Sequence, residues 1–147
     1  MKKILVILTL VLTVSTGFAG TGEEAVNKKA ISAFKAEFVG ATEAAWTAGT
    51  NYYKVAFTMN DQKLFAFYDS DGEFVAVTRY ISSFQLPLYL QTTLKQSYSN
   101  YWITDLFEVA TNDGTTYYTT LETADSKIIL TSGDGRFWTT YQKSKKA

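Results

Sequence analysis

Two spacings of apolar residues alternate along the chain, one typical of helices and the other typical of strands. The first helical stretch has apolar residues three and four positions apart: Ile31, Phe34 and Phe38. The segment from Thr21 to Glu24 (Thr-Gly-Glu-Glu) fits a capping box before this stretch. Gly40 is a typical stop after it. We therefore predict a helix over residues 23–39.

A second helical stretch has an apolar residue at every fourth position. These residues are Leu86, Leu90, Leu94 and Tyr98. Pro87 suits the first position of a helix, because the N–H that proline lacks would have no partner inside the helix there. We predict that this helix begins at Pro87 and runs to about Ser97.

Each helical stretch is followed by short runs in which apolar and polar residues alternate, as in half-buried strands. Turn residues separate the runs, and loops of about two to four residues join antiparallel neighbours. Each half of the chain is therefore predicted to form an antiparallel meander. The expected strands are residues 43–47, 52–59, 63–68 and 74–81, then 101–111, 115–123, 127–131 and 136–142.

The two halves resemble each other in sequence as well as in pattern. Tyr52-Tyr53 is matched 65 residues later by Tyr117-Tyr118, each time just after a glycine turn. A repeat at a fixed spacing predicts a fold made of similar units. We expect the α+β class, with two tandem helix-plus-four-stranded units in one layered domain and both helices on one sheet face. The expected bounds are about residues 23–81 and 82–142, within a domain of residues 20–142.

Aromatic residues are more numerous than one buried sheet face requires. The chain has 10 Tyr, 10 Phe and 3 Trp, whereas an antiparallel sheet packed on one side needs apolar residues on one face only. Tyr53, Val55 and Phe57 are expected to share one face. The remaining rings either complete a curved core or form a binding patch beside a polar hairpin tip at residues 60–62. The candidate partner-binding residues are Trp46, Asp61, Phe65, Phe67, Trp102, Tyr117 and Trp138.

The N-terminal segment has the features of a secretory signal. Lys2 and Lys3 precede an apolar run at residues 4–14, and residues 17–19 (Gly-Phe-Ala) form a small-residue cleavage site. The run has 11 residues, whereas a membrane-spanning helix needs about 20. We predict a signal peptide at residues 1–19 and a periplasmic or secreted protein without a membrane span after cleavage.

The sequence contains neither Cys nor His, which excludes several kinds of chemistry. A thiol nucleophile, an imidazole base and a zinc site with Cys or His ligands are all ruled out, and we expect no metal or cofactor. Removal of Lys2 and Lys3 from the 14 basic residues leaves 12, against 14 acidic residues. The basic cluster at residues 143–147 is expected to be a solvated tail. Without a basic stripe, the chain does not favour nucleic-acid binding.

Acidic residues give weaker signals. The segment from Asp69 to Glu73 alternates carboxylates as calcium loops do, but it lacks the spacing and the distant Glu of an EF-hand. A plain hairpin turn is therefore expected there. The remaining carboxylates, Asp105 and Glu122 among them, show no motif that would pair two of them across a cleft, as glycoside hydrolysis requires. We assign no catalytic residue.

Several segments together carry a family resemblance. These segments are residues 30–34, 40–46, 52–57, 68–72, 86–87 and 117–118. Their order resembles the PepSY-like family of small bacterial periplasmic proteins, which are described as beta-lactamase-inhibitor-like. The resemblance covers about residues 25–142. It implies tandem helix-plus-sheet repeats, export from the cytoplasm, and a partner enzyme gripped by an aromatic sheet face and its hairpin tips.

These features favour an exported, non-enzymatic binding module for a protein or peptide partner, with enzyme inhibition by steric occlusion as one form of it. An envelope structural or glycan-binding protein is the alternative. An enzyme that works with carboxylates alone is the third hypothesis. A monomer is favoured over an assembly.

Overall fold

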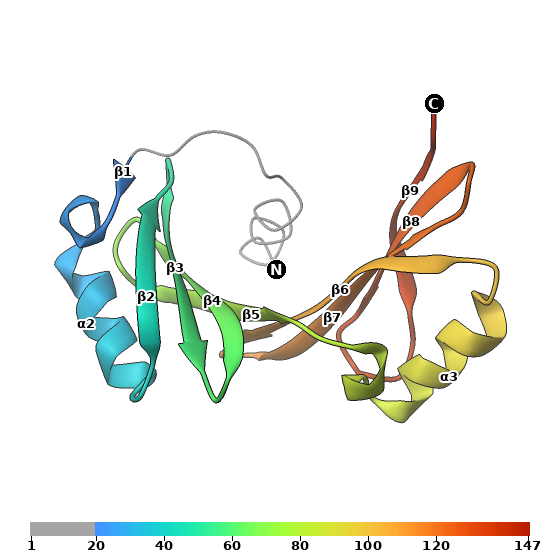
Figure 1. Ribbon diagram of the computed structural model, residues 1–147, viewed down its shortest axis with the longest axis horizontal. Coiled ribbons are helices and arrows are strands. Elements are labelled where there is room, and N and C mark those ends of the chain that lie inside the picture. Colours follow the sequence, from blue (N-terminus) through green and yellow to red (C-terminus); the bar gives the residue numbers. More distant parts are fainter. Residues whose placement is uncertain (1–19) are drawn as a thin grey trace. The chain divides into compact units, whose positions relative to one another are not determined.

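The computed structural model describes residues 20–147, so the predicted signal peptide at residues 1–19 lies outside the described residues. The described chain has two α-helices, and its strands are hydrogen-bonded neighbours in chain order from β1 to β9 (Figure 1). This confirms the predicted α+β class and the antiparallel meander. The chain divides into two compact units, the first ending at Val77 and the second beginning at Thr78.

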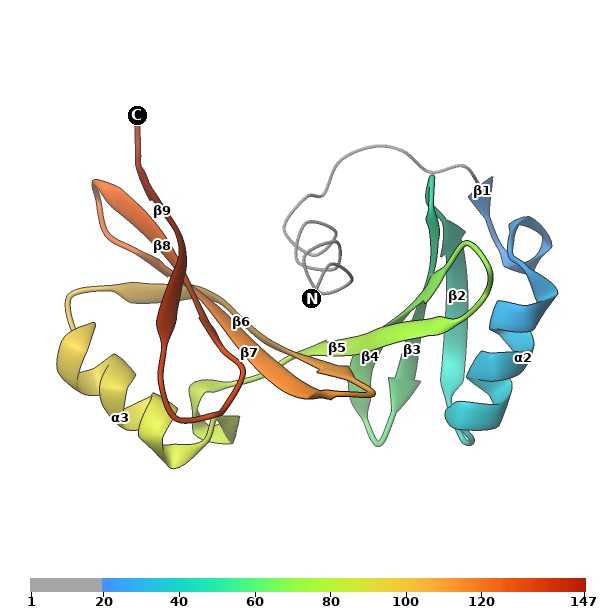
Figure 2. The ribbon, with the colours of Figure 1, turned by 180° about the vertical axis from the view of Figure 1, so that it is seen from behind.

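Both units contain a 3-10 turn, an α-helix and a meander. Unit 1 has β1 (Gly20–Thr21), η1 (Glu23–Ala25), α2 (Lys28–Glu37), β2 (Thr42–Ala48), β3 (Tyr52–Met59), β4 (Gln62–Asp69) and most of β5 (Phe74–Tyr80). Unit 2 has η2 (Ser83–Gln85), α3 (Leu88–Ser97), β6 (Trp102–Thr111), β7 (Gly114–Glu122), β8 (Ser126–Ser132) and β9 (Thr139–Lys145) (Figure 2). β3 has its predicted bounds, and β9 is the only one of the predicted strands that differs by more than one residue at an end.

The first helix begins later than predicted. The Asn27 side chain caps α2 by accepting a hydrogen bond from the Lys29 N–H (2.9 Å). The predicted capping box at Thr21 is wrong, because Thr21 lies in β1 and pairs with Thr47 of β2. Glu23 and Glu24, which were predicted to begin the helix, lie in the separate 3-10 turn η1.

The second helix is confirmed with a shift of one residue. Pro87 is the N-cap of α3 and Leu88 is its first helical residue. A capping box does occur just before it, where the Ser82 N–H donates to Gln85 Oε1 (2.9 Å) and closes η2. Ser97 ends the helix, as predicted.

The core of unit 1 is built largely from rings. Phe34 of α2 packs edge-on against Phe57 of β3, with 5.0 Å between ring centroids, and against Trp46 of β2 at 5.5 Å. Val55 and Phe57 are both fully buried on this side of β3. The predicted alternation of β3 is therefore confirmed, since its core-facing residues are two apart.

The core of unit 2 is mainly aliphatic. Its buried residues are Ile81, Leu86, Leu90, Leu94, Leu106, Leu121, Ile128 and Leu130. Residues 86–101 have the same order of buried, half-buried and exposed positions as residues 26–41 of unit 1. The two helices therefore pack with matching faces, although the side chains that they bury differ.

The matched tyrosine pairs do not occupy matching positions. Tyr53 packs on the core of unit 1, whereas in unit 2 the residue that packs on the core is Tyr117. Tyr118, its neighbour in β7, is therefore on the opposite sheet face, because successive side chains alternate. The sequence match at 65 residues differs by one from the spacing of 64 between these core-facing residues, and a slip of one residue exchanges the two faces.

The last strand begins three residues later than predicted. The Asp134 carboxylate accepts hydrogen bonds from the Arg136 N–H (2.8 Å) and the Phe137 N–H (3.1 Å), which hold these residues in a turn. β9 then extends to Lys145. The strand thus includes part of the segment predicted as a basic tail, residues 143–147.

Candidate partner-binding site

Two of the three tryptophans, both predicted to bind a partner, belong to the cores instead. Trp46 is buried between Phe34 and Tyr68, with ring centroids 5.5 and 5.7 Å away. Trp138 is half-buried on the core of unit 2, and its Nε1–H donates to the Leu90 carbonyl oxygen of α3 (3.1 Å). Both side chains stabilise the packing of a helix on its sheet.

Two predicted phenylalanines lie on the face of unit 1 away from α2. Phe67 is buried there beside Tyr52, with 6.3 Å between ring centroids. Phe65 is half-buried, and the Lys54 ammonium lies 4.9 Å from its ring centroid. Burial lowers the pKa of Lys54. The Phe65 ring therefore already contacts a cation of the same unit, Lys54.

The other predicted residues are Tyr117 and Trp102 of unit 2 and Asp61 of unit 1. Tyr117 packs partly on the core of unit 2, and Trp102 is 52% exposed with the Lys146 ammonium 5.4 Å from its ring. Asp61 is exposed at the β3–β4 turn. Asn60 and Asp61 both have positive φ (51° and 60°), as a two-residue hairpin turn requires, so this tip is shorter than predicted. Within unit 1, Trp46 lies in the core whereas Phe65 and Phe67 lie on the opposite sheet face.

A different set of rings lies together on the face of unit 2 away from α3. We call it the ring row, and its members are Tyr80, Phe107, Tyr118 and Tyr141. Phe107 and Tyr118 are directly paired across β6 and β7, and their rings stack at 5.3 Å with an interplanar angle of 17°. Tyr80 meets Phe107 edge-on at 6.2 Å, and Tyr141 meets Tyr118 edge-on at 6.3 Å. The four rings thus form a continuous series from β5 to β9.

The ring row is accessible at its ends. Tyr80 is 59% exposed and Tyr141 is 38% exposed, whereas Phe107 and Tyr118 are 2% and 4% exposed. Burial raises the pKa of Tyr118, and a hydrogen bond with Thr131 acts in the opposite direction. The two inner rings therefore hold the outer tyrosines in place and leave them free to contact another molecule.

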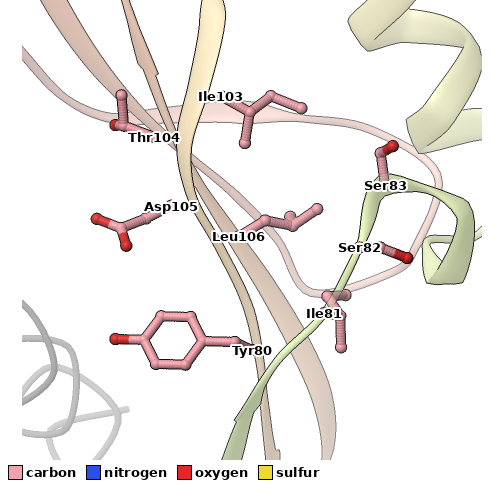
Figure 3. Close-up of a pocket in the computed structure, with 8 residues that line it drawn as sticks. All are labelled: Tyr80, Ile81, Ser82, Ser83, Ile103, Thr104, Asp105 and Leu106. Atoms are coloured by element: carbon pink, nitrogen blue, oxygen red, sulfur yellow. The ribbon is translucent and has the colours of Figure 1, made fainter.

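A cleft of about 330 Å³ adjoins the Tyr80 end of the ring row. β5 and β6 part there, just after the Ile81 N–H donates to the Leu106 carbonyl oxygen (3.0 Å). Side chains of Tyr80, Thr104 and Asp105 extend to one side of β6, and those of Ile103 and Leu106 extend to the other (Figure 3). The bulge in β6 between Ile103 and Asp105 produces this division.

Charge in the cleft comes from Asp105. Burial raises the pKa of Tyr80, and the Asp105 carboxylate raises it further. Among residues 20–147, no ion pair to Asp105 is found, whereas the nearby acid Glu122 pairs with Lys146 (2.6 Å) and Lys127 (3.9 Å). The cleft thus combines an exposed ring with a carboxylate that has no cationic partner in the described part of the chain.

The described part of the chain gives no support for a metal site or for a membrane-spanning helix. Within residues 20–147, no three His, Cys, Asp or Glu side chains are grouped so as to hold a metal ion. Neither α2 nor α3 is long and apolar enough to cross a membrane.

Sequence reasoning missed the ring row because β6 and β7 carry apolar residues on both faces. Leu106 faces the core and Phe107 follows it on the other side. The pair of adjacent large apolar residues was the available signal, since a strand with one buried face alternates. In the sequence, Asp105 is one carboxylate among several without a motif.

Solved structures share this fold. A BLIP-like protein from Bacteroides fragilis has a TM-score of 0.69 and 18% identity, over 81% of this chain and 85% of that chain. A DUF2874 family protein from Bacteroides uniformis has a TM-score of 0.69 and 14% identity, over 82% and 89%. A candidate periplasmic protein from Bacteroides eggerthii has a TM-score of 0.67 and 14% identity, over 82% and 88%. No family model and no curated protein match the chain.

Proposed function

We propose that this chain is an exported, non-enzymatic binding module that docks a protein or peptide partner against the ring row of unit 2. The observation that carries the proposal is the pair of exposed tyrosines, Tyr80 and Tyr141, held by two buried rings between them. Tyrosine is favoured at interfaces because it buries a large area with few rotamers to restrict. A preorganised surface also loses less entropy on binding.

The likeness to solved structures supports a binding role. One neighbour is named a BLIP-like protein and another a candidate periplasmic protein. Location in the periplasm and inhibition of a partner enzyme by steric occlusion are parts of this proposal. So is descent of the two units from one duplicated, PepSY-like half, for which the shared burial order of residues 26–41 and 86–101 is the support.

A monomeric state is part of the same proposal. β9 is the last strand in the order, and all of its residues are exposed. An exposed edge can pair with another chain. Lys143 and Lys145 lie on this edge strand, and lysines at such edges oppose pairing between copies.

Partner capture tests the proposal. The protein is immobilised and exposed to periplasmic extract of its host, and the retained proteins are identified. Tyr141→Ala is expected to lower the affinity for a retained protein by at least about tenfold, as removal of an anchoring aromatic residue does. Tyr89→Ala is the matched control, because Tyr89 is an exposed tyrosine of α3 outside the ring row. Equal capture by the wild type, Tyr141→Ala and Tyr89→Ala would contradict the proposal.

A glycan-binding envelope protein is the second candidate. Trp102 favours it, since its ring is exposed and could stack on a sugar, whereas Trp46 and Trp138 pack in the cores. Retention of the protein by peptidoglycan, and its loss in Trp102→Ala, would support this function. No retention by peptidoglycan would exclude it in favour of the protein partner.

A further inference from the structure

The carboxylate of Asp105 is distinctive because several basic residues of the sheet pair with other acids. Arg79 of β5 pairs with Glu108, and Lys127 and Lys146 both pair with Glu122. No hydrogen bond of the Asp105 side chain is found among the described residues, and its backbone carbonyl accepts from the Thr119 hydroxyl (3.1 Å). The half-buried carboxylate is thus available to a cation from outside the chain.

The Tyr80 ring lies beside this carboxylate. Both side chains extend to the same side of β6 (Figure 3), and the Asp105 charge contributes to the raised pKa of Tyr80. Phe107 supports the ring from one edge at 6.2 Å, while 59% of Tyr80 remains exposed. A carboxylate next to an aromatic face is the combination that a guanidinium group binds, by paired hydrogen bonds and by stacking.

The size of the cleft suits one long side chain. Its volume is about 330 Å³, on the order of ten times the share of liquid volume of one water molecule. Ile103 and Leu106 line the side of the cleft away from Asp105. On the Asp105 side, the exposed Tyr80 ring is the apolar surface that the methylene groups of such a side chain would contact while its charged end reaches Asp105.

Unit 1 has no such site at the corresponding strand position. A bulge precedes Ala45 in β2 as one precedes Asp105 in β6, and these residues pair with Ala56 of β3 and Thr120 of β7. Ala44 and Ala45 stand where unit 2 has Thr104 and Asp105. The carboxylate is therefore not required by the bulged fold, because unit 1 forms the same bulge without it.

We propose that the cleft between β5 and β6 is an anchor site for an arginine side chain of the docked partner, with Asp105 accepting from its guanidinium and Tyr80 stacking on it. This inference rests on the proposed function, since it names a residue of the partner that docks on the ring row. It identifies the partner segment as one that presents an arginine next to apolar or aromatic residues.

Small probes test the anchor site directly. N-acetyl-arginine amide is titrated into the isotope-labelled protein and followed by NMR, with N-acetyl-citrulline amide as the neutral probe of the same shape. We expect saturable shifts at the amides of Thr104 and Asp105 and at the Tyr80 ring with the arginine probe. Shifts of equal size with citrulline would overturn the proposal, because the charge would then play no part.

Substitution of the carboxylate completes the test. Asp105→Asn is expected to weaken binding of the arginine probe by at least about fivefold, as loss of a charged hydrogen-bond partner does. Asp113→Asn, in the exposed β6–β7 turn of the same unit, is the matched control and should bind as the wild type does. Unchanged binding in Asp105→Asn would overturn the proposal. A circular dichroism melt of each variant verifies that the sheet is intact.

The two proposals fail in different ways. If Tyr141→Ala lowers partner capture while the arginine probe causes no shift, the anchor inference is wrong and the binding function stands. If the probe binds at Asp105 while Tyr141→Ala and Tyr80→Ala capture partners as the wild type does, the cleft is supported as an arginine site and the proposed docking surface is wrong.

Discussion

The two units have the same order of elements and place their aromatic residues differently. In unit 1 the core holds the rings: Phe34, Trp46, Phe57 and Tyr68 are all buried there. In unit 2 the core is mainly aliphatic, and stacked rings lie on the opposite sheet face at Phe107 and Tyr118. One backbone arrangement thus tolerates either choice, because each core requires apolar volume and not a particular side chain.

The sheet faces away from the two helices also differ between the units. At the strand position that Tyr118 has in β7, β3 has Lys54, whose ammonium lies over its own Phe65. In unit 2 the same face presents two tyrosines and the carboxylate of Asp105. On this face, Lys54 of unit 1 therefore lies against a ring of its own unit, whereas unit 2 leaves its exposed tyrosines and Asp105 available for binding.

Core truncation should give the largest effect. Phe57→Ala is expected to lower the free energy of unfolding by about 3–5 kcal/mol, because it removes a buried ring that contacts Phe34 and Phe38 at 5.0 and 4.9 Å. Leu121→Ala, at the corresponding position of β7, should cost about 1 kcal/mol less, since no ring pairs are lost. Urea unfolding followed by circular dichroism measures both. A larger loss in Leu121→Ala would contradict the assignment of the ring-rich core to unit 1.

Much of this fold could be predicted from spacing alone. β3 alternates strictly, so its bounds and the shared face of Tyr53, Val55 and Phe57 were both predicted correctly. Helix starts were less certain, because Thr21 fits a cap in sequence but pairs with Thr47 in the sheet. Pairing with a distant strand overrode a local signal there.

The site could not be predicted in the same way. Trp46 and Trp138 have large amphipathic side chains, a property that suits a core as well as an interface. The sequence match aligns Tyr118 with Tyr53, but Tyr117 is the residue that packs on the core, because a spacing wrong by one residue exchanges the faces. The position of the bulge before Asp105 depends on how β6 pairs with β7, which local sequence does not specify.

A buried hydroxyl offers a second contrast between the units, of intermediate size. Tyr68 Oη has no hydrogen-bond partner among the described residues, and burial raises the pKa of Tyr68. At the corresponding position of β8, the Ser132 hydroxyl donates to Asp134 Oδ1 and accepts from the Gly135 N–H, both at 3.2 Å. The first hydroxyl is unsatisfied and the second is satisfied.

Removal of the two hydroxyls should therefore change the free energy of unfolding in opposite directions. Tyr68→Phe is expected to raise the free energy of unfolding by about 1 kcal/mol, since an unpaired buried polar group is destabilising. Ser132→Ala should lower it by about 1 kcal/mol, because the Gly135 N–H loses its acceptor. Thermal unfolding of both variants checks this. A loss of stability in Tyr68→Phe would show that its hydroxyl is satisfied in solution.

The smallest contrast is in how stability depends on pH, and it arises from one surface ion pair in each unit. In unit 1, a hydrogen bond to Glu73 and the Glu73 charge raise the pKa of Lys29 above its ordinary 10.5. The pair therefore stabilises the fold fully below pH 10.5, and this contribution is lost as pH rises through the higher folded pKa. In unit 2, a hydrogen bond from Lys146 lowers the pKa of Glu122 below its ordinary 4.5. That contribution is present above pH 4.5 and is lost as pH falls through the lower folded pKa.

Neutral variants should separate the two contributions. Lys29→Met is expected to flatten the alkaline end of the stability profile, and Lys146→Met is expected to flatten its acid end. Lys143→Met, also on β9 but without an ion pair among the described residues, serves as the control. The free energy of unfolding is measured across the pH range at low salt, because salt screens exposed pairs and their effects are small. If Lys29→Met left the alkaline end unchanged, or Lys146→Met left the acid end unchanged, the assignment of these pairs to the pH response would be wrong.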